Sequence, residues 1–177
     1  MPIGVVVYIS DGSDKCGYAM TASSIQKNIM WSNDFVTTGI GTTVNWQKAI
    51  KNFDACANTQ EIIQKGDFLN YPAAWAAVNY APSAAPATEG KWCLPAPGML
   101  NSLYKNLNAI NNTISKLGGT QLTGDNEHIW SSSEYSESYA WYFCTKDGAS
   151  QGGVHHYSKD SLGNYLGPSV VRPVIAF

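Results

Sequence analysis

Helical periodicity stops at Gly118 and Gly119, and this change constrains the fold more than any other feature of the sequence. Before the two glycines, apolar residues recur at three- and four-residue spacing from Pro97 to Leu117, which predicts a helical region broken near Asn108. After them the spacing disappears, and serine, tyrosine, glycine and histidine dominate. The sequence therefore predicts an α+β fold whose C-terminal third is not helical.

Strand signals lie at both ends of the chain and in the serine- and tyrosine-rich region. Residues 3–10 alternate in character and GYAMTAS follows a turn, so we expect two strands there. The pair Asp147-Gly148 between AWYFCT and GGVHHYSK predicts a β-hairpin. The density of valine and isoleucine in SVVRPVIAF predicts a buried final strand, with Pro173 at an edge or a bulge.

Two shorter helices are expected before the main helical region. Asn58 and Glu61 have the spacing of a capping box, and Gly66 ends that helix. Pro72 begins a second helix in YPAAWAAVNY, and residues 81–90 form a loop rich in proline and alanine. Residues 23–57 show no clear element, but their large apolar side chains are expected in the core: Trp31, Phe35, Trp46, Ile50 and Phe53.

Length and charge exclude several classes of partner. A chain of 177 residues is long enough for one domain with a sizeable core, so we expect residues 1–177 to form a single domain. The net charge is −2 and no run of lysine or arginine occurs, which argues against nucleic acid. No apolar stretch approaches the roughly 20 residues of a membrane span, so no direct membrane insertion is expected. Residues 1–10 lack the basic region of a signal peptide.

The cysteines are Cys16, Cys56, Cys93 and Cys144, and none has CxxC spacing. This spacing disfavours a zinc knuckle or a redox motif. Because a domain of this size does not need covalent cross-links for stability, we expect most of the cysteines to be thiols. The three possible pairings stay open.

Catalytic and metal-binding chemistry has few candidates. His155 and His156 would point to opposite faces of a strand, so they are poorly placed to share one ion. Asp125, Asn126 and Glu127 in GDNEH lack the spacing of an EF-hand loop and are interpreted as a solvated turn. No glycine-rich phosphate loop or GxSxG motif occurs. We expect no catalytic residues, no metal and no cofactor.

An ordered series of motifs resembles a bacterial and phage family. KWCLPAPGMLNSLY precedes INNTISKLGGTQL, IWSSSEYSESYAWYF, a DG turn and VVRPVIAF at the C-terminus. With PIGVVVYISDG and NTQEII, this series is similar to the DUF1566-like proteins of C-type lectin-like fold, which include the variable proteins of diversity-generating retroelements. Cys93 stands where that family usually has tyrosine, and residues 96–100 lack its Ser-x-x-Glu-Leu pattern, although Pro97 can begin a helix without the serine.

The resemblance implies an α+β, C-type lectin-like fold with adjacent N- and C-terminal strands and two or more helices. It also implies a long irregular C-terminal region, at about residues 130–168, that presents side chains to a ligand. In the retroelement-linked members, adenine-directed mutagenesis rewrites codons of that region and leaves the scaffold unchanged. The calcium-dependent sugar-binding motifs of animal C-type lectins do not occur in this chain.

The candidate binding residues follow from this resemblance. They are residue types that an asparagine codon reaches when its adenines change, and their mixture is typical of antibody-like binding surfaces. We expect Tyr139 and Tyr142 to be the exposed members. The full set of expected ligand-binding residues is Ser136, Ser138, Tyr139, Tyr142, Cys144, Thr145, Ser150, Gly153, His155, His156, Tyr157, Asp160, Ser161, Leu162, Asn164 and Tyr165.

Residues that match the fixed part of the family motif are expected to pack inside. Arg172 needs a counter-charge in its apolar strand, because a buried guanidinium is costly to desolvate, and we expect Glu134 to contribute it. The expected scaffold residues are Trp130, Ser131, Ser132, Glu134, Ala140, Trp141, Gly148, Lys159, Val171, Arg172, Pro173, Val174 and Phe177.

These observations predict a non-catalytic ligand-binding domain of receptor or adhesion type. Its diversified C-terminal surface would face a protein or glycan on a cell surface. The resemblance implies a location on a bacterial cell surface or a phage tail, with any signal or anchor outside this segment. The alternative is a structural module of a bacterial cell-envelope protein that has no diversified site.

Overall fold

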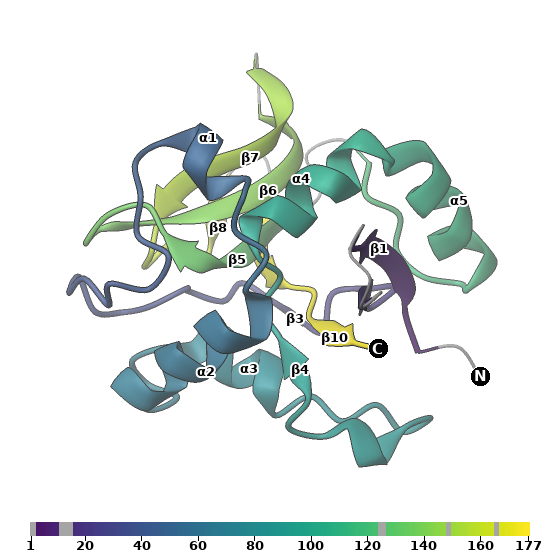
Figure 1. The fold of residues 1–177 in the computed structure, drawn as a ribbon, viewed down its shortest axis with the longest axis horizontal. Helices are drawn as coiled ribbons and strands as arrows, with labels where there is room; N and C mark the ends of the chain where they lie inside the picture. The colour runs from purple at the N-terminus through teal and green to yellow at the C-terminus, as the bar shows by residue number, and fades with distance from the viewer. Residues whose placement is uncertain (1–2, 11–15, 124–126, 148–149, 165–166) are drawn as a thin grey trace.

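The chain folds into a mixed α+β structure, and its described residues form five α-helices and two β-sheets (Figure 1). The computed structural model describes residues 3–10, 16–123, 127–147, 150–164 and 167–177. In Figure 1 the helices lie on several sides of the strands, and the two ends of the chain lie on the same side of the molecule. The α+β class expected from the change at the glycine pair is confirmed.

The first sheet contains both ends of the chain. Its antiparallel strands have the order β1-β2-β10-β4, with bounds β1 (Val5–Ile9), β2 (Gly17–Met20), β10 (Val174–Ala176) and β4 (Trp92–Cys93). Met20 of β2 is opposite Val5 on one side and Val174 on the other. The expectation that the N- and C-terminal strands are direct neighbours is therefore wrong, because β2 lies between them.

The second sheet contains the strands of residues 128–171 and one short strand from the N-terminal part of the chain. Its order is β3-β9-β5-β6-β7, and the strands are β3 (Gln26–Lys27), β9 (Gly167–Val171), β5 (His128–Glu134), β6 (Tyr139–Asp147) and β7 (Ser150–Ser158), with β8 (Gly163–Asn164) paired to β9. Strands β5 and β9 are parallel, whereas β6 and β7 form the expected antiparallel hairpin. This region is thus a sheet with irregular connections rather than an irregular segment.

The last apolar segment forms two strands instead of one. Strand β9 belongs to the second sheet and β10 to the first, and the chain passes between them at Arg172 and Pro173. Proline has no N–H to donate to a strand ladder, so it suits this break between two strands, and the expected position at an edge or a bulge is wrong.

The helices follow the local signals closely, with one shifted start. They are α1 (Trp46–Ala49), α2 (Ala55–Lys65), α3 (Pro72–Val78), the 3-10 helix η1 (Pro86–Thr88), α4 (Pro97–Lys105) and α5 (Leu107–Lys116). Pro72 begins α3 as predicted, and the main helical region breaks at Asn106. Asn58 does not cap α2, because its amide points into the core and donates to the hydroxyl oxygens of Ser132 and Ser133.

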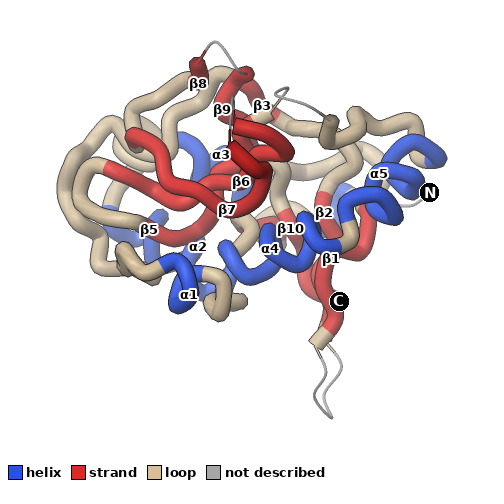
Figure 2. Tube along the Cα trace, turned by 90° about the horizontal axis from the view of Figure 1, so that it is seen from above, coloured by secondary structure: helices blue, strands red, loops and turns tan. Residues whose placement is uncertain are grey.

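Strand β6 separates two parts of the core. Trp141 and Phe143 pack with helix α4 and strand β1 on one face, whereas Ala140, Tyr142 and Cys144 pack with helix α3 on the other. This alternation follows from the two-residue period of a strand. Figure 2 shows helices α4 and α5 following one another along one side of the molecule.

The scaffold expectations hold for most of the motif. Every expected scaffold residue that the structure describes is buried except Phe177, while Gly148 lies outside the described residues. Phe177 is 63% exposed. Its ring lies against Gly17, where a side chain would collide with it. Placing Phe177 in the core is therefore wrong.

The buried charges pair differently from the expectation. The guanidinium of Arg172 lies 2.6 Å from Glu127 and also donates to the carbonyl oxygens of Ala22 and Thr120. Burial lowers the pKa of Arg172, and Glu127 offsets part of this effect.

Glu134 instead pairs with Lys159. The proposed Glu134–Arg172 contact is wrong, and Glu127 is a buried counter-ion rather than part of a solvated turn; Asp125 and Asn126 lie outside the described residues.

Two of the four cysteines are cross-linked. Cys56 in α2 and Cys93 in β4 form a disulfide between positions separated by 37 residues. Cys16 is exposed and Cys144 is buried, and both are thiols. The expectation that most cysteines are thiols is wrong for the first pair, because the fold brings α2 directly against β4.

Candidate ligand-binding surface

The two faces of the β6–β7 hairpin carry different aromatic side chains. Trp141 is opposite His156, and Tyr142 is opposite His155. The two histidines therefore lie on opposite faces of the sheet, as predicted for neighbours in a strand. The His156 ring contacts Trp141, whereas the His155 ring contacts Tyr142. Each face must be considered separately as a binding surface.

Four aromatic rings gather where one face of the hairpin meets solvent: Tyr135, Tyr139, Trp141 and His156, here called the ring cluster. The rings of Tyr135 and His156 are stacked, with centroids 3.9 Å apart. Tyr139 contacts both of these rings edge-on, at 6.3 Å from Tyr135 and 5.7 Å from His156. Trp141 forms the floor of the cluster, because it is buried and contacts Tyr135 at 5.1 Å.

Backbone hydrogen bonds hold the ring cluster in place. The N–H groups of Tyr135 and Ser136 both donate to the carbonyl oxygen of Tyr139, which closes the turn between β5 and β6. The N–H of Lys159 donates to the carbonyl oxygen of Ser138 and joins this turn to the end of β7. The Nε1–H of Trp141 donates to the carbonyl oxygen of Thr43, at 3.0 Å. Hydrogen bonds within the turn, to the end of β7 and to Thr43 therefore hold the residues that carry the rings.

The neighbouring rings change the ionisation of His156. Desolvation lowers the pKa of His156 below its ordinary value of 6.5, and the charge of the adjacent His155 lowers it further. A neutral imidazole can stack on Tyr135 and still exchange a hydrogen bond with a ligand, since one nitrogen donates and the other accepts. The ring cluster is thus an uncharged, largely aromatic surface at neutral pH.

Most of the expected binding residues that the structure describes reach solvent. Tyr139 is 42% exposed, and the other exposed members are His156, Asp160 and Leu162. Partial exposure is found for Ser136, Ser138, Thr145, His155, Tyr157 and Ser161. Tyr165 lies outside the described residues, as do the side chains of Ser150 and Asn164.

Three expected binding residues are buried. Tyr142 is 2% exposed, and Cys144 and Gly153 are also inside. Tyr142 and Cys144 point to the face of β6 that packs against Trp130 and helix α3. The expectation that Tyr142 is exposed is therefore wrong: two tyrosines three positions apart in one strand point to opposite faces.

No sequence signal predicts that residues 43–46 lie beside this surface. Asn45 accepts a hydrogen bond from the backbone N–H of Lys48 and begins α1, which directs Trp46 toward the hairpin. The Nε1–H of Trp46 donates to the carbonyl oxygen of Val154 at 3.1 Å, and 47% of Trp46 is exposed. Trp46 and Phe35 were expected in the core, but both are exposed, so this expectation is wrong. Tyr135 was also missed, although it lies within the motif region.

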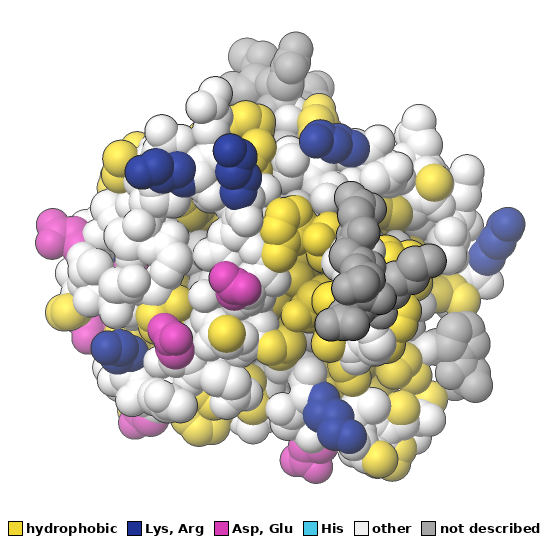
Figure 3. Space-filling view, viewed as in Figure 1, with side chains coloured by type: hydrophobic (Ala, Val, Ile, Leu, Met, Phe, Trp, Pro, Cys, Tyr) yellow, Lys and Arg dark blue, Asp and Glu magenta, His cyan; other side chains and the backbone are white. Residues whose placement is uncertain are grey.

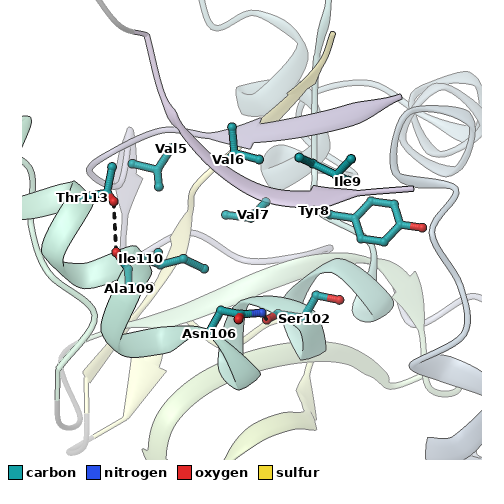
Figure 4. Close-up of a pocket in the computed structure, with 10 residues that line it drawn as sticks. All are labelled: Val5, Val6, Val7, Tyr8, Ile9, Ser102, Asn106, Ala109, Ile110 and Thr113. Carbon is teal, nitrogen blue, oxygen red and sulfur yellow. Dashed lines mark hydrogen bonds between the residues drawn. The ribbon is translucent and has the colours of Figure 1, made fainter. Parts of the chain in front are cut away.

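Helix α4 borders more than one hollow. The indole hollow, of about 410 Å³, is bounded by Trp46, by Asn101, Tyr104 and Lys105 of α4, and by β7 from Gly152 to His155. Another hollow, of about 440 Å³, lies between β1 and helices α4 and α5, with Val6, Tyr8, Ser102 and Asn106 among its lining residues (Figure 4). Figure 3 shows hydrophobic side chains exposed near the middle of one face, with acidic and basic side chains scattered around them.

The described residues place no metal site or membrane span beside these features. No three His, Cys, Asp or Glu side chains come together as ligands within the part of the chain that the structure describes. Along the same residues, no helix is both long enough and apolar enough to cross a bilayer. Comparisons with protein-family models, with curated proteins and with solved structures give no match for this chain.

Proposed function

We propose that this chain is a non-catalytic ligand-binding domain of C-type lectin-like fold that presents the ring cluster to a protein or glycan target. The observation that carries the proposal is the gathering of Tyr135, Tyr139 and His156 at the surface above the buried ring of Trp141. Aromatic side chains held in one geometry lose little conformational entropy on binding, and they dominate the energetics of many protein interfaces.

The surroundings of the ring cluster support a binding role. Ser136 and Ser138 lie in the same turn and are partly exposed, so hydroxyl groups lie next to the rings. Large contact areas from tyrosine combined with small adaptable hydroxyls are typical of antibody-like surfaces. The C-type lectin-like part of the proposal rests on the motif series and on the α+β arrangement, in which strands from both ends of the chain share one sheet and residues 128–171 supply most of the other.

The location on a bacterial surface or phage tail and the diversification of the surface belong to the same proposal. Sequencing of the gene's surroundings tests the second part. A reverse transcriptase gene and a near-copy of the C-terminal coding segment would support it, with adenine differences in the codons of exposed residues such as Tyr139 and His156. Differences in the codons of the buried Tyr142 and Cys144 would count against it.

A capture experiment tests the binding role directly. The immobilised domain is incubated with solubilised bacterial envelope fractions, and the retained material is compared between variants. We expect Tyr139→Ala/His156→Ala to lose retained components that the native chain holds. Leu69→Ala is the matched control, because Leu69 is also a large exposed apolar residue, at 69%, but lies between α2 and α3.

The outcome separates the two candidate functions. If both variants retain the same material as the native chain, the ring cluster is not a ligand-binding surface. The alternative then gains support: a structural module of a cell-envelope protein whose aromatic surface packs against a neighbouring domain.

A further inference from the structure

The indole hollow differs from the ring cluster in shape and in charge. Its volume of about 410 Å³ falls in the range of small-ligand sites. Asn101, Tyr104 and Lys105 come from one face of α4, because residues three and four positions apart lie together on a helix. Gly153 lines the opposite wall with a φ of 140°, a conformation that favours glycine, so this wall carries no side chain at that point.

Two aromatic rings of the hollow are held independently of any ligand. The hydrogen bond from Trp46 Nε1 to Val154 fixes the indole and leaves nearly half of the residue exposed. Tyr104 packs edge-on against the buried ring of Phe143, with centroids 6.1 Å apart. These rings provide a rigid apolar surface that loses little entropy when a flat ligand packs on it.

Two polar groups of the hollow have no partner within the described residues. The amide of Asn101 makes no side-chain hydrogen bond there, and the ammonium of the exposed Lys105 makes no ion pair or hydrogen bond with a described residue. None of the described lining residues is a carboxylate. The hollow therefore combines an aromatic surface with an uncommitted amide and an uncommitted positive charge.

We propose that the indole hollow binds an acidic sugar unit, a pyranose that carries a carboxylate. The CH-rich face of the sugar would pack on the ring of Trp46, its hydroxyls would bond to Asn101, and its carboxylate would accept a charge-assisted hydrogen bond from Lys105. An extended peptide fits less well. Strand β7 is an edge strand, but Trp46 already occupies the carbonyl oxygen of Val154, which a peptide strand would use there.

This inference rests on the proposed ligand-binding function and narrows it to one ligand class at the indole hollow. The inference can fail while the binding role of the ring cluster stands. The test records the indole N–H signals of the ¹⁵N-labelled chain during titration with tetragalacturonate and with neutral maltotetraose, each to about 10 mM, tenfold above a Kd of about 1 mM. Each of the six tryptophans carries one indole N–H, and Trp46→Phe assigns the signal of Trp46. Trp92, which is fully buried, is the internal control.

We expect the acidic tetrasaccharide to shift the Trp46 signal and the neutral one to shift it much less. Trp46→Ala should weaken binding about tenfold or more, in line with the weight of tryptophan in binding sites. Lys105 is exposed on the helix surface, so Lys105→Gln should keep the fold. The loss of its positive charge should remove the preference for the acidic sugar. Unchanged melting temperatures identify variants that remain folded.

Three results would overturn the inference. The first is the absence of a Trp46 shift with either sugar. The second is an equal response to both sugars that Lys105→Gln leaves unchanged. This result would show that the hollow does not recognise the carboxylate of the sugar. The third is binding that Tyr139→Ala/His156→Ala abolishes and Trp46→Ala does not affect: the ligand would then bind the ring cluster, and the proposed function would stand without this site.

Discussion

The carboxylate of Glu134 and the ammonium of Lys159 form an ion pair in which both side chains are completely buried. Glu134 ends β5 and Lys159 follows β7, so the pair joins the two ends of the segment that carries the ring cluster. Glu134 also accepts hydrogen bonds from the backbone N–H groups of Thr38 and Gly39 and from the hydroxyl of Thr42. One carboxylate therefore positions both the 38–42 loop and the hairpin.

Removing this charge should strongly destabilise the fold. Glu134→Gln preserves the size of the side chain but leaves the ammonium of Lys159 buried without a counter-charge, and breaking such a pair costs about 3–5 kcal/mol. Urea denaturation measures the free energy of unfolding. The matched control is Glu137→Gln, an exposed carboxylate in the next turn, which should change stability by no more than about 0.5 kcal/mol. Equal effects of the two variants would contradict this role for Glu134.

The burial of β6 predicts opposite outcomes for its aromatic residues. Trp141→Ala and Tyr142→Ala remove buried rings and should each cost about 3–5 kcal/mol of unfolding free energy. Tyr139→Ala removes an exposed ring and should change stability by about 0.5 kcal/mol or less. Thermal and urea unfolding of the three variants measure this difference. A Tyr142→Ala variant as stable as Tyr139→Ala would show that the assignment of the two faces is wrong.

The disulfide between Cys56 and Cys93 should contribute measurably to stability. It closes a loop between positions separated by 37 residues, and a cross-link of this kind stabilises a fold by about 2–4 kcal/mol, mainly by restricting the unfolded chain. We expect Cys56→Ala/Cys93→Ala to lower the melting temperature, and a reducing agent to lower that of the native chain but not that of the variant. Cys16→Ala, at an exposed thiol, is the control. A native chain insensitive to reduction would contradict the contribution of this bond.

Local signals in the sequence predicted the elements whose cause is local. The Asp-Gly pair gave the β6–β7 hairpin, Pro72 gave the start of α3, and the apolar spacing after Pro97 gave a helical region with one break. Turn chemistry and helix initiation depend on a few neighbouring residues, so one sequence is sufficient for them. The opposite orientation of His155 and His156 followed from strand geometry in the same way.

Features that depend on which elements meet could not be predicted. Tyr139 and Tyr142 have the same side chain in one strand, but only Tyr142 points to the face of β6 that packs in the core with Trp130. The partner of Arg172 depends on the position of Glu127 beside β9, and the partner of Cys56 depends on the contact between α2 and β4. The hydrophobicity of Trp46 predicted a core position. It could not show that α1 holds this residue against the edge of β7, where its indole bonds to Val154.

The partial burial of His156 in the ring cluster predicts a pH-dependent loss of stability. The folded-state pKa of His156 lies below the ordinary value of 6.5, mainly through desolvation, so the unfolded chain takes up this proton more readily than the folded one. Above a pH of about 6.5 the histidine is neutral in both states and contributes its full stabilisation. Stability should then fall as the pH decreases through 6.5, until the folded-state pKa is also passed.

Unfolding free energies of the native chain and of His156→Gln, measured between a pH of about 7.5 and about 4.5, test this sign. Glutamine does not titrate, so the difference between the two chains reports the titration of His156 together with its coupling to His155. We expect the native chain to lose more stability than the variant over this interval. Parallel curves would show that partial burial does not disfavour the charged imidazole of His156, and the ring cluster would then accept a positive charge at no energetic cost.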